Sequence, residues 1–168
     1  MMTKTHSLSA AYFSLVFISS KIALNFFPVK PYIFIGASII AATFPDIDIP
    51  TSKIGRLFYP ISKFINKFFG HRTITHSLLG CCIFSFGIYK LLHIFNFNPY
   101  IYVNFLYGAL FGYIIHILGD ILTNKGVQLF YPFKRRVRFP ITFPTGGSAE
   151  WFLIGVMIVG IFVSIVNY

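Results

Sequence analysis

The sequence predicts an all-α fold, a polytopic bundle of about five transmembrane helices with basic amphipathic helices on the membrane surface. Of the 168 residues, 56% are hydrophobic and 11% are charged, which lies outside the range of ordinary soluble domains. The apolar residues form runs long enough to cross a bilayer, and basic stretches separate these runs. The length of the chain corresponds to a single membrane-embedded domain, residues 1–168.

Apolar runs that are candidates for membrane spans occur along the whole chain, because about 20 apolar residues cross about 30 Å of hydrocarbon. The candidate spans are residues 8–27, 28–45, 77–96, 100–122 and 151–167. Lys4 before the first run is also typical of a signal peptide. No clear small-x-small cleavage site follows this run, so we expect it to be a span.

The net charge of +10 is unevenly distributed over the predicted loops. Eleven of the 14 Lys and Arg residues fall on the same side as the N-terminus, and Lys21, Lys30 and Lys90 fall on the other. The positive-inside rule makes the basic side cytoplasmic, with the N-terminus inside and the C-terminus outside. We expect these cations to face anionic lipid headgroups, and no nucleic-acid partner, because no recognition module is visible.

The first basic stretch also carries apolar residues at helical spacing. These residues are Ile54, Leu57, Phe58, Ile61, Phe64, Ile65 and Phe68. The spacing predicts one or two helices that lie on the membrane surface, with a break near Pro60.

Two short motifs occur twice in the chain. The stretch DIPTSKIGRLFYP from Asp48 and the stretch DILTNKGVQLFYP from Asp120 are identical at eight of thirteen positions without a gap. The pattern Thr-x-Thr-His-Ser-Leu surrounds both His6 and His76. Such internal similarity indicates a duplicated unit.

Each copy of this unit consists of Thr-His-Ser-Leu, two spans, an aspartate and a basic loop. The copies cover residues 3–66 and 73–138, and a last helix, residues 150–168, follows them. Because two spans return the chain to its starting side, the sequence predicts two parallel two-helix repeats plus a final helix.

Ionisable side chains gather at one predicted side of the membrane, where such groups are costly and usually functional. All four acidic residues, and every histidine except His93, fall at cytoplasmic ends of spans. His116 and Asp120 lie one helical turn apart, which suits two ligands of one metal ion, although the same spacing is common on helix surfaces. The candidate metal ligands are His6, Asp46, Asp48, His71, His76, His116 and Asp120.

The chemistry of these ligands favours particular metals. Imidazole and carboxylate together favour zinc, manganese or iron over calcium, with zinc first. Seven candidates exceed one tetrahedral shell, so we expect two ions. Gly108 and Gly112 continue the stripe of His116 and Asp120, which predicts close packing of this helix face on a neighbouring helix.

Arg72 and Glu150 are candidates for catalytic roles. Arg72 lies next to His71 and suits a clamp for phosphate or carboxylate, with a lipid-headgroup contact as the alternative. Glu150 follows the glycine turn TGGSA at the start of the last span. It could serve as a base or as an eighth ligand, or could simply sit favourably in the first turn of a helix.

The motifs resemble those of the YdjM-like family, described as LexA-regulated, membrane-bound, metal-dependent hydrolases. The resemblance covers most of the chain and rests on Thr5-His6, FPDIDIP from Phe44, GHRTITHSLLG from Gly70, HILGDILTNKGVQLFYPF from His116 and TGGSAE from Thr145. It implies a bundle of membrane helices in a bacterial or archaeal inner membrane. By analogy, it also implies that the seven His and Asp side chains bind the metal of a hydrolase.

We therefore expect a hydrolase at the cytoplasmic surface of the membrane. A divalent metal would activate water for attack on a phosphoester, and Arg72 would offset the developing negative charge. A lipid or other amphiphilic substrate suits a site level with the headgroups. The alternatives are a metal-ion transporter, whose site would usually lie near the bilayer midplane, and a non-catalytic membrane scaffold.

Overall fold

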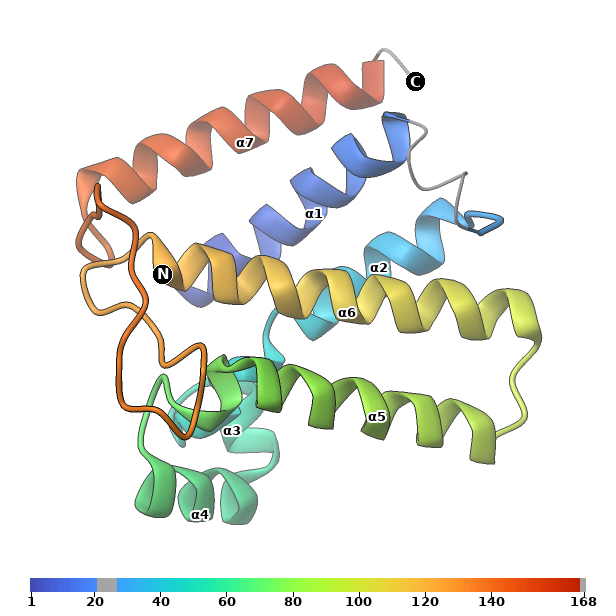
Figure 1. Ribbon diagram of the computed structural model, residues 1–168. Coiled ribbons are helices and arrows are strands. Elements are labelled where there is room, and N and C mark those ends of the chain that lie inside the picture. Colours follow the sequence, from blue (N-terminus) through green and yellow to red (C-terminus); the bar gives the residue numbers. More distant parts are fainter. Residues whose placement is uncertain (21–26, 167–168) are drawn as a thin grey trace.

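The structure, a computed structural model, describes residues 1–20 and 27–166 (Figure 1). Its helices are α1 (Thr3–Ser19), α2 (Pro31–Ala41), η2 (Phe44–Asp48), α3 (Lys53–Leu57), α4 (Tyr59–Phe69), η3 (Ile74–His76), α5 (Leu78–Ile94), α6 (Pro99–Ile121) and α7 (Ser148–Val166). The predicted all-α class is confirmed, since extended pairing within the described residues is limited to two isolated bridges.

The long helices alternate in direction, so the starts of some helices and the ends of others lie at the same end of the bundle. The starts of α1, α5 and α7 lie at the same end as the C-terminal ends of α2 and α6 (Figure 1). Helix α6 packs on α1, α2 and α5, and α7 packs on α1. Residues that flank these helix ends are therefore brought together from all parts of the sequence.

Fewer helices than predicted are long enough to cross a membrane. Within the described residues, α6 with 23 residues and α7 with 19 residues meet the length and hydropathy that a span requires. Helix α2 has 11 residues, and α1 and α5 have 17 each, so about five full spans are not confirmed. Proline explains the short α2, because the apolar run 28–45 contains Pro28 and Pro31 at one end and Pro45 at the other. Part of the first predicted span, residues 21–26, lies outside the described residues.

Glycines on α6 allow close contact with α2, as the sequence predicts. A Cβ atom at Gly108 would lie 2.4 Å from the carbonyl oxygen of Phe34, and one at Gly112 would lie 2.0 Å from that of Ser38. The two backbones therefore touch where these glycines face α2. This contact fixes the C-terminal end of α6 beside the end of α2, where the candidate ligands lie.

The two basic stretches adopt different structures. The first forms α3 and α4, which meet at Phe58, and Pro60 lies in the first turn of α4, so the predicted break is confirmed. The second, residues 122–147, contains no helix within the described residues, so a second amphipathic surface helix is not present there. Gly126 has a positive φ of 58° and three prolines follow it, which prevents a continuous helix.

Candidate metal centre

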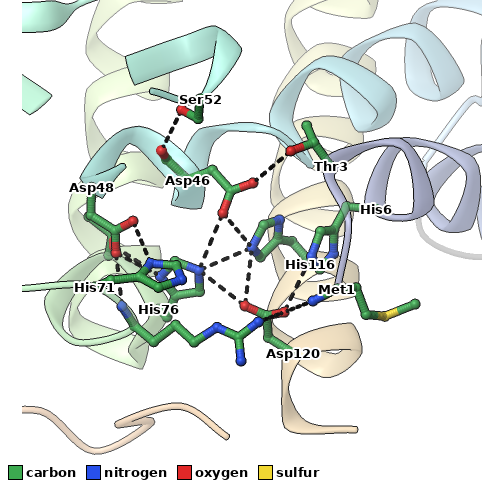
Figure 2. Close-up of polar contacts among 12 residues, drawn as sticks. Met1, Thr3, His6, Asp46, Asp48, Ser52, His71, His76, His116 and Asp120 are labelled. Atoms are coloured by element: carbon green, nitrogen blue, oxygen red, sulfur yellow. Dashed lines mark hydrogen bonds and ion pairs between the residues drawn. The ribbon is translucent and has the colours of Figure 1, made fainter. Parts of the chain in front are cut away.

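All seven candidate ligands lie in one cluster at the common end of the helices (Figure 2). They form three groups, and within each group the potential ligand atoms lie within 4.8 Å of one another. The groups are His6, His116 and Asp120; Asp46, His76 and His116; and Asp48, His71 and His76. The structure thus brings together the side chains that the sequence selects, and metal binding by them stays a prediction.

The local fold around each histidine of the repeated motif differs between the two copies. His76 ends the short helix η3, and the next residue, Ser77, caps α5 by accepting a hydrogen bond from the Gly80 amide at 3.1 Å. His6 lies within the first turns of α1, which has no side-chain cap. The serine of the motif therefore caps a helix in the second copy, whereas α1 in the first copy begins without a side-chain cap.

Four side chains at the middle of the cluster, Asp46, His76, His116 and Asp120, here called the central group, have spacings close to those of a tetrahedral metal site. The Nε2 atoms of His76 and His116 are 3.1 Å apart, and Asp120 Oδ2 lies 3.3 Å from the first and 3.7 Å from the second. Asp46 Oδ1 lies 3.9 and 3.8 Å from the same two nitrogens. A tetrahedral zinc ion with bonds of about 2.0–2.1 Å separates its ligand atoms by about 3.3 Å. Each carboxylate therefore lies near enough to both nitrogens to share one ion with them.

Hydrogen bonds on the opposite edges of the imidazoles direct their Nε2 atoms toward this centre. His116 Nδ1 donates to the carbonyl oxygen of Ala42 at 2.7 Å, so Nδ1 carries the proton of the neutral ring. His76 Nδ1 lies 3.2 Å from Asp48 Oδ2. Two Nε2 lone pairs then face each other at close range, an arrangement that requires a proton or a metal ion between them.

Burial and the neighbouring carboxylates have opposite effects on the pKa of His76. Burial alone would lower this pKa, but hydrogen bonds with Asp120 and Asp48, together with their negative charge, raise it to about 9. For Asp48, burial alone would raise the pKa of the carboxyl group. Hydrogen bonds from His71 and His76 instead lower this pKa well below its usual range. Without a metal, a proton on His76 supplies the positive charge that the carboxylates favour.

His6 marks a second potential ion position. Its ring stacks on His116 with 3.6 Å between centroids, and its Nε2 lies 3.3 Å from Asp120 Oδ1. The side chain is 1% exposed, yet its Nδ1 has no hydrogen-bond partner within the part of the chain that the structure describes. An unsatisfied buried imidazole indicates a missing ligand, because buried polar groups in proteins are nearly always paired. His6 and His76 occupy matching positions of the repeated motif. His6 faces Oδ1 of Asp120, and His76 faces Oδ2 of the same carboxylate (Figure 2).

Asp48 and Asp120, which the repeat equates, have different surroundings. Asp120 lies between the imidazoles of His6, His76 and His116. Asp48 faces Nδ1 of His76 from the outer side and also accepts hydrogen bonds from the Thr75 hydroxyl at 2.7 Å and the Arg72 amide at 3.0 Å. Its other oxygen lies 2.9 Å from His71 Nδ1. Asp120 is therefore placed to hold an ion, and Asp48 to orient His76.

Arg72 lies inside the cluster. Its side chain is buried, with Nη2 donating to Asp120 Oδ1 at 2.7 Å and Nη1 donating to the Thr123 hydroxyl at 2.6 Å. Its backbone has a positive φ of 62°, which turns the amide toward Asp48. The guanidinium is therefore inside the protein, and its role stays a prediction. The N-terminal amine of Met1 also contacts Asp120 Oδ1 (Figure 2).

Glu150 is buried but lies outside the three groups of potential ligands. Its Oε1 accepts a hydrogen bond from the Met2 amide at 2.6 Å, and its Oε2 accepts one from the Gly146 amide at 2.7 Å. In this position the carboxylate joins the start of α7 to the start of α1. A role as base or eighth ligand stays a prediction, and the contacts support a structural role.

Sequence reasoning missed several residues that support the ligands. Thr75 holds Asp48, Thr3 donates to Asp46 Oδ2 at 3.3 Å, and the Ala42 carbonyl orients His116. Both threonines belong to the repeated Thr-x-Thr-His motif, Thr3 at its first position and Thr75 at its third, so the motif contained a signal for them. A backbone carbonyl leaves no such signal in the sequence.

A helical membrane protein with a buried His/Asp cluster at one end of its bundle is the class that the fold and the site define. Comparison with known proteins agrees: the chain belongs to the YdjM inner membrane protein family, whose sequence model matches residues 1–167. It is 39% identical over 116 residues to the inner membrane protein YdjM of Escherichia coli (strain K12), which covers 67% of this chain and 56% of that protein. It is also 34% identical over 129 residues to the uncharacterized protein YvsG of Bacillus subtilis (strain 168), which covers 76% of this chain and 75% of that protein.

The chain matches only part of the length of two of these relatives. The chain spans 56% of the Escherichia coli relative and the same share of the Shigella flexneri protein of that name. No solved structure matches the chain.

Proposed function

We propose that this protein is a metal-dependent hydrolase of the inner membrane that acts on a phosphoester of a lipid or other amphiphile. The observation that carries the proposal is the central group, in which two Nε2 atoms and two carboxylates meet at spacings close to those of a tetrahedral site. The hydrogen bonds behind His116 and His76 support it, because partners of this kind orient metal-binding histidines.

The residues present fit one or two divalent ions, with zinc first and manganese or iron as alternatives. Asp46, His76, His116 and Asp120 would hold the first ion, and His6 with the second oxygen of Asp120 would hold the other. Such ions lower the pKa of water and offset negative charge during hydrolysis.

Arg72 would contribute directly to substrate binding. In the structure, Nη2 of Arg72 donates a hydrogen bond to Asp120. The Nε atom of Arg72 has no partner within the described residues. When Asp120 holds an ion, the guanidinium is freed to bind a phosphate, for which its planar donors are suited.

The cluster would lie at the cytoplasmic face, with the N-terminus inside and the C-terminus outside. Helices α1, α2 and α5 lie alongside α6, and α1 also lies alongside α7, which supports a multi-pass arrangement (Figure 1). In a background that carries Cys81→Ser and Cys82→Ser, we expect Lys53→Cys and Lys134→Cys to resist impermeant thiol reagents in intact cells. A tag after Tyr168 should be reached from outside. Labelling of either loop from outside would overturn this orientation.

Replacement of His116 tests the metal centre most directly. Purified His116→Ala protein should contain far less zinc, manganese or iron by inductively coupled plasma mass spectrometry, since His116 belongs to two of the three groups. His93→Ala is the matched control, because His93 is exposed near the end of α5, outside those groups. Equal metal content in His116→Ala, His93→Ala and the unaltered protein would contradict the proposal.

A further inference from the structure

An apolar groove runs between α1, α6 and α7 and reaches the candidate metal centre. Helices α6 and α7 both pack on α1, and between them lies a cavity of about 470 Å³. This volume falls within the range of about 300–1,000 Å³ that is common for ligand pockets. Its walls are formed mainly by apolar side chains, among them Phe13, Ile115, Leu118, Leu153 and Val156.

The few polar atoms at the groove do not provide a recognition site for a polar ligand. The Ser9 hydroxyl is directed to the sulfur of Met157 at 3.3 Å. The Tyr12 ring is pressed against Gly160, where a Cβ atom would lie 2.4 Å from Tyr12 Cε2. No charged side chain lines this cavity within the described part of the chain. The groove therefore suits hydrocarbon.

Gly119 connects the groove to the cluster. It lines the groove, and it precedes Asp120 in the last turns of α6. A Cβ atom at this position would lie 3.3 Å from both Cε1 and Nδ1 of His6. Because Gly119 has no side chain, the Met1 thioether and the His6 imidazole both approach it, and the Met1 sulfur would be nearest to an added Cβ atom, at 2.8 Å. Met1 lines the inner end of the groove and lies there next to His6, which belongs to a potential ligand group.

The other end of the groove faces the surroundings of the bundle. Phe13, Leu118 and Val156 are 44%, 51% and 47% exposed, so they form an apolar rim. Helices α6 and α7 are the two described helices that can cross a membrane, so this rim would lie among lipid chains. A ligand that enters from the bilayer would meet apolar surface first and ionisable groups last.

We propose that this groove holds one hydrocarbon chain of a membrane phospholipid, with the phosphate directed toward His6 and Asp120. The placement of the phosphate rests on the proposed function, whereas the binding of the chain rests on the groove alone. The polarity gradient from Val156 to His6 matches that of a lipid from tail to headgroup. It explains how a substrate reaches side chains that are almost fully buried.

The test uses the full chain in vesicles of phosphatidylethanolamine and phosphatidylglycerol that contain phosphatidic acid with a diazirine in one acyl chain. After illumination, mass spectrometry measures labelling of the peptide that contains residues 115–122. Val156→Trp should lower this labelling by about tenfold, the scale expected when an inserted side chain overfills an apolar space. Val159→Trp is the matched control, because Val159 is exposed on the same helix and does not line the groove.

Labelling of residues 115–122 that is equal in Val156→Trp and Val159→Trp would overturn the proposal. Metal content in both variants separates this failure from a failure of the proposed function. If metal and phosphodiesterase activity persist while groove labelling is absent, the groove proposal alone is wrong. If labelling follows the prediction while the protein holds no metal, the groove binds lipid and the hydrolase proposal is wrong.

Discussion

Asp120→Asn should remove most of the metal from the purified protein and abolish hydrolysis, whereas Asp48→Asn should weaken metal binding and leave part of the activity. Asp120 contacts three imidazoles and has an oxygen on each predicted ion position. Loss of its charge would cost about 3–5 kcal/mol, the scale of an unpaired buried charge. Asp48 orients His76 from the outer side, and loss of such a partner costs about 10–100-fold in metal affinity.

A control is needed because Asp120→Asn also leaves the buried Arg72 guanidinium without its anionic partner. The double variant Arg72→Gln/Asp120→Asn removes this lone charge. It should insert into membranes and elute from size exclusion like the unaltered protein, and still lack metal. Metal content and phosphodiesterase activity that remain unchanged in both Asp48→Asn and Asp120→Asn would show that the site is wrong. Poor insertion of both single variants, with no metal in the unaltered protein, would favour the scaffold alternative.

Much of the candidate site could be predicted because ionisable residues are rare in this chain. Four acids and five histidines in 168 residues leave few ways to place polar groups in a helical bundle. Alternating spans bring alternate helix ends to one side of the bundle, so His6, Asp46, His76 and His116 gather there in any such arrangement. The glycine stripe likewise predicted the contact with α2, since small residues allow helix backbones to touch.

The distinct roles of equivalent residues could not be predicted. The repeat makes Asp48 and Asp120 alike, but Asp48 is the last residue of the short helix η2 and Asp120 lies within α6. This difference in backbone turns Asp48 toward Nδ1 of His76 and Asp120 toward Nε2. The burial of Arg72 depends on a positive φ that sequence patterns do not reveal for a residue other than glycine.

Helix lengths were the least predictable feature of the fold. Hydropathy predicted a span over residues 28–45, whereas α2 ends at Ala41 and the chain continues as η2. The apolar side chains Phe44 and Ile47 belong to η2, where they line a cavity next to α4 and α5. Apolar composition therefore did not fix the end of the helix in this run.

Gly112→Ala should both destabilise the bundle and weaken the metal centre. The added methyl group would lie 2.0 Å from the Ser38 carbonyl oxygen, which belongs to backbone and cannot rotate away. Helix α2 must therefore move from α6, at a cost of about 1–3 kcal/mol for overpacking. This movement would carry the Ala42 carbonyl away from His116 and Asp46 away from His76, because both groups follow α2 directly.

Gly36→Ala is the matched control for this substitution. Gly36 also lies in an interior position of a helix, α2, but a Cβ atom there would meet nothing within 4 Å. Alanine should be neutral or slightly stabilising at this position, by about 0.5–1 kcal/mol. Heating each variant in detergent before size exclusion measures stability, and plasma mass spectrometry measures metal. If Gly112→Ala retains the melting temperature and metal content of Gly36→Ala, the α2–α6 contact does not position the cluster, and its ligands must be held by the loops instead.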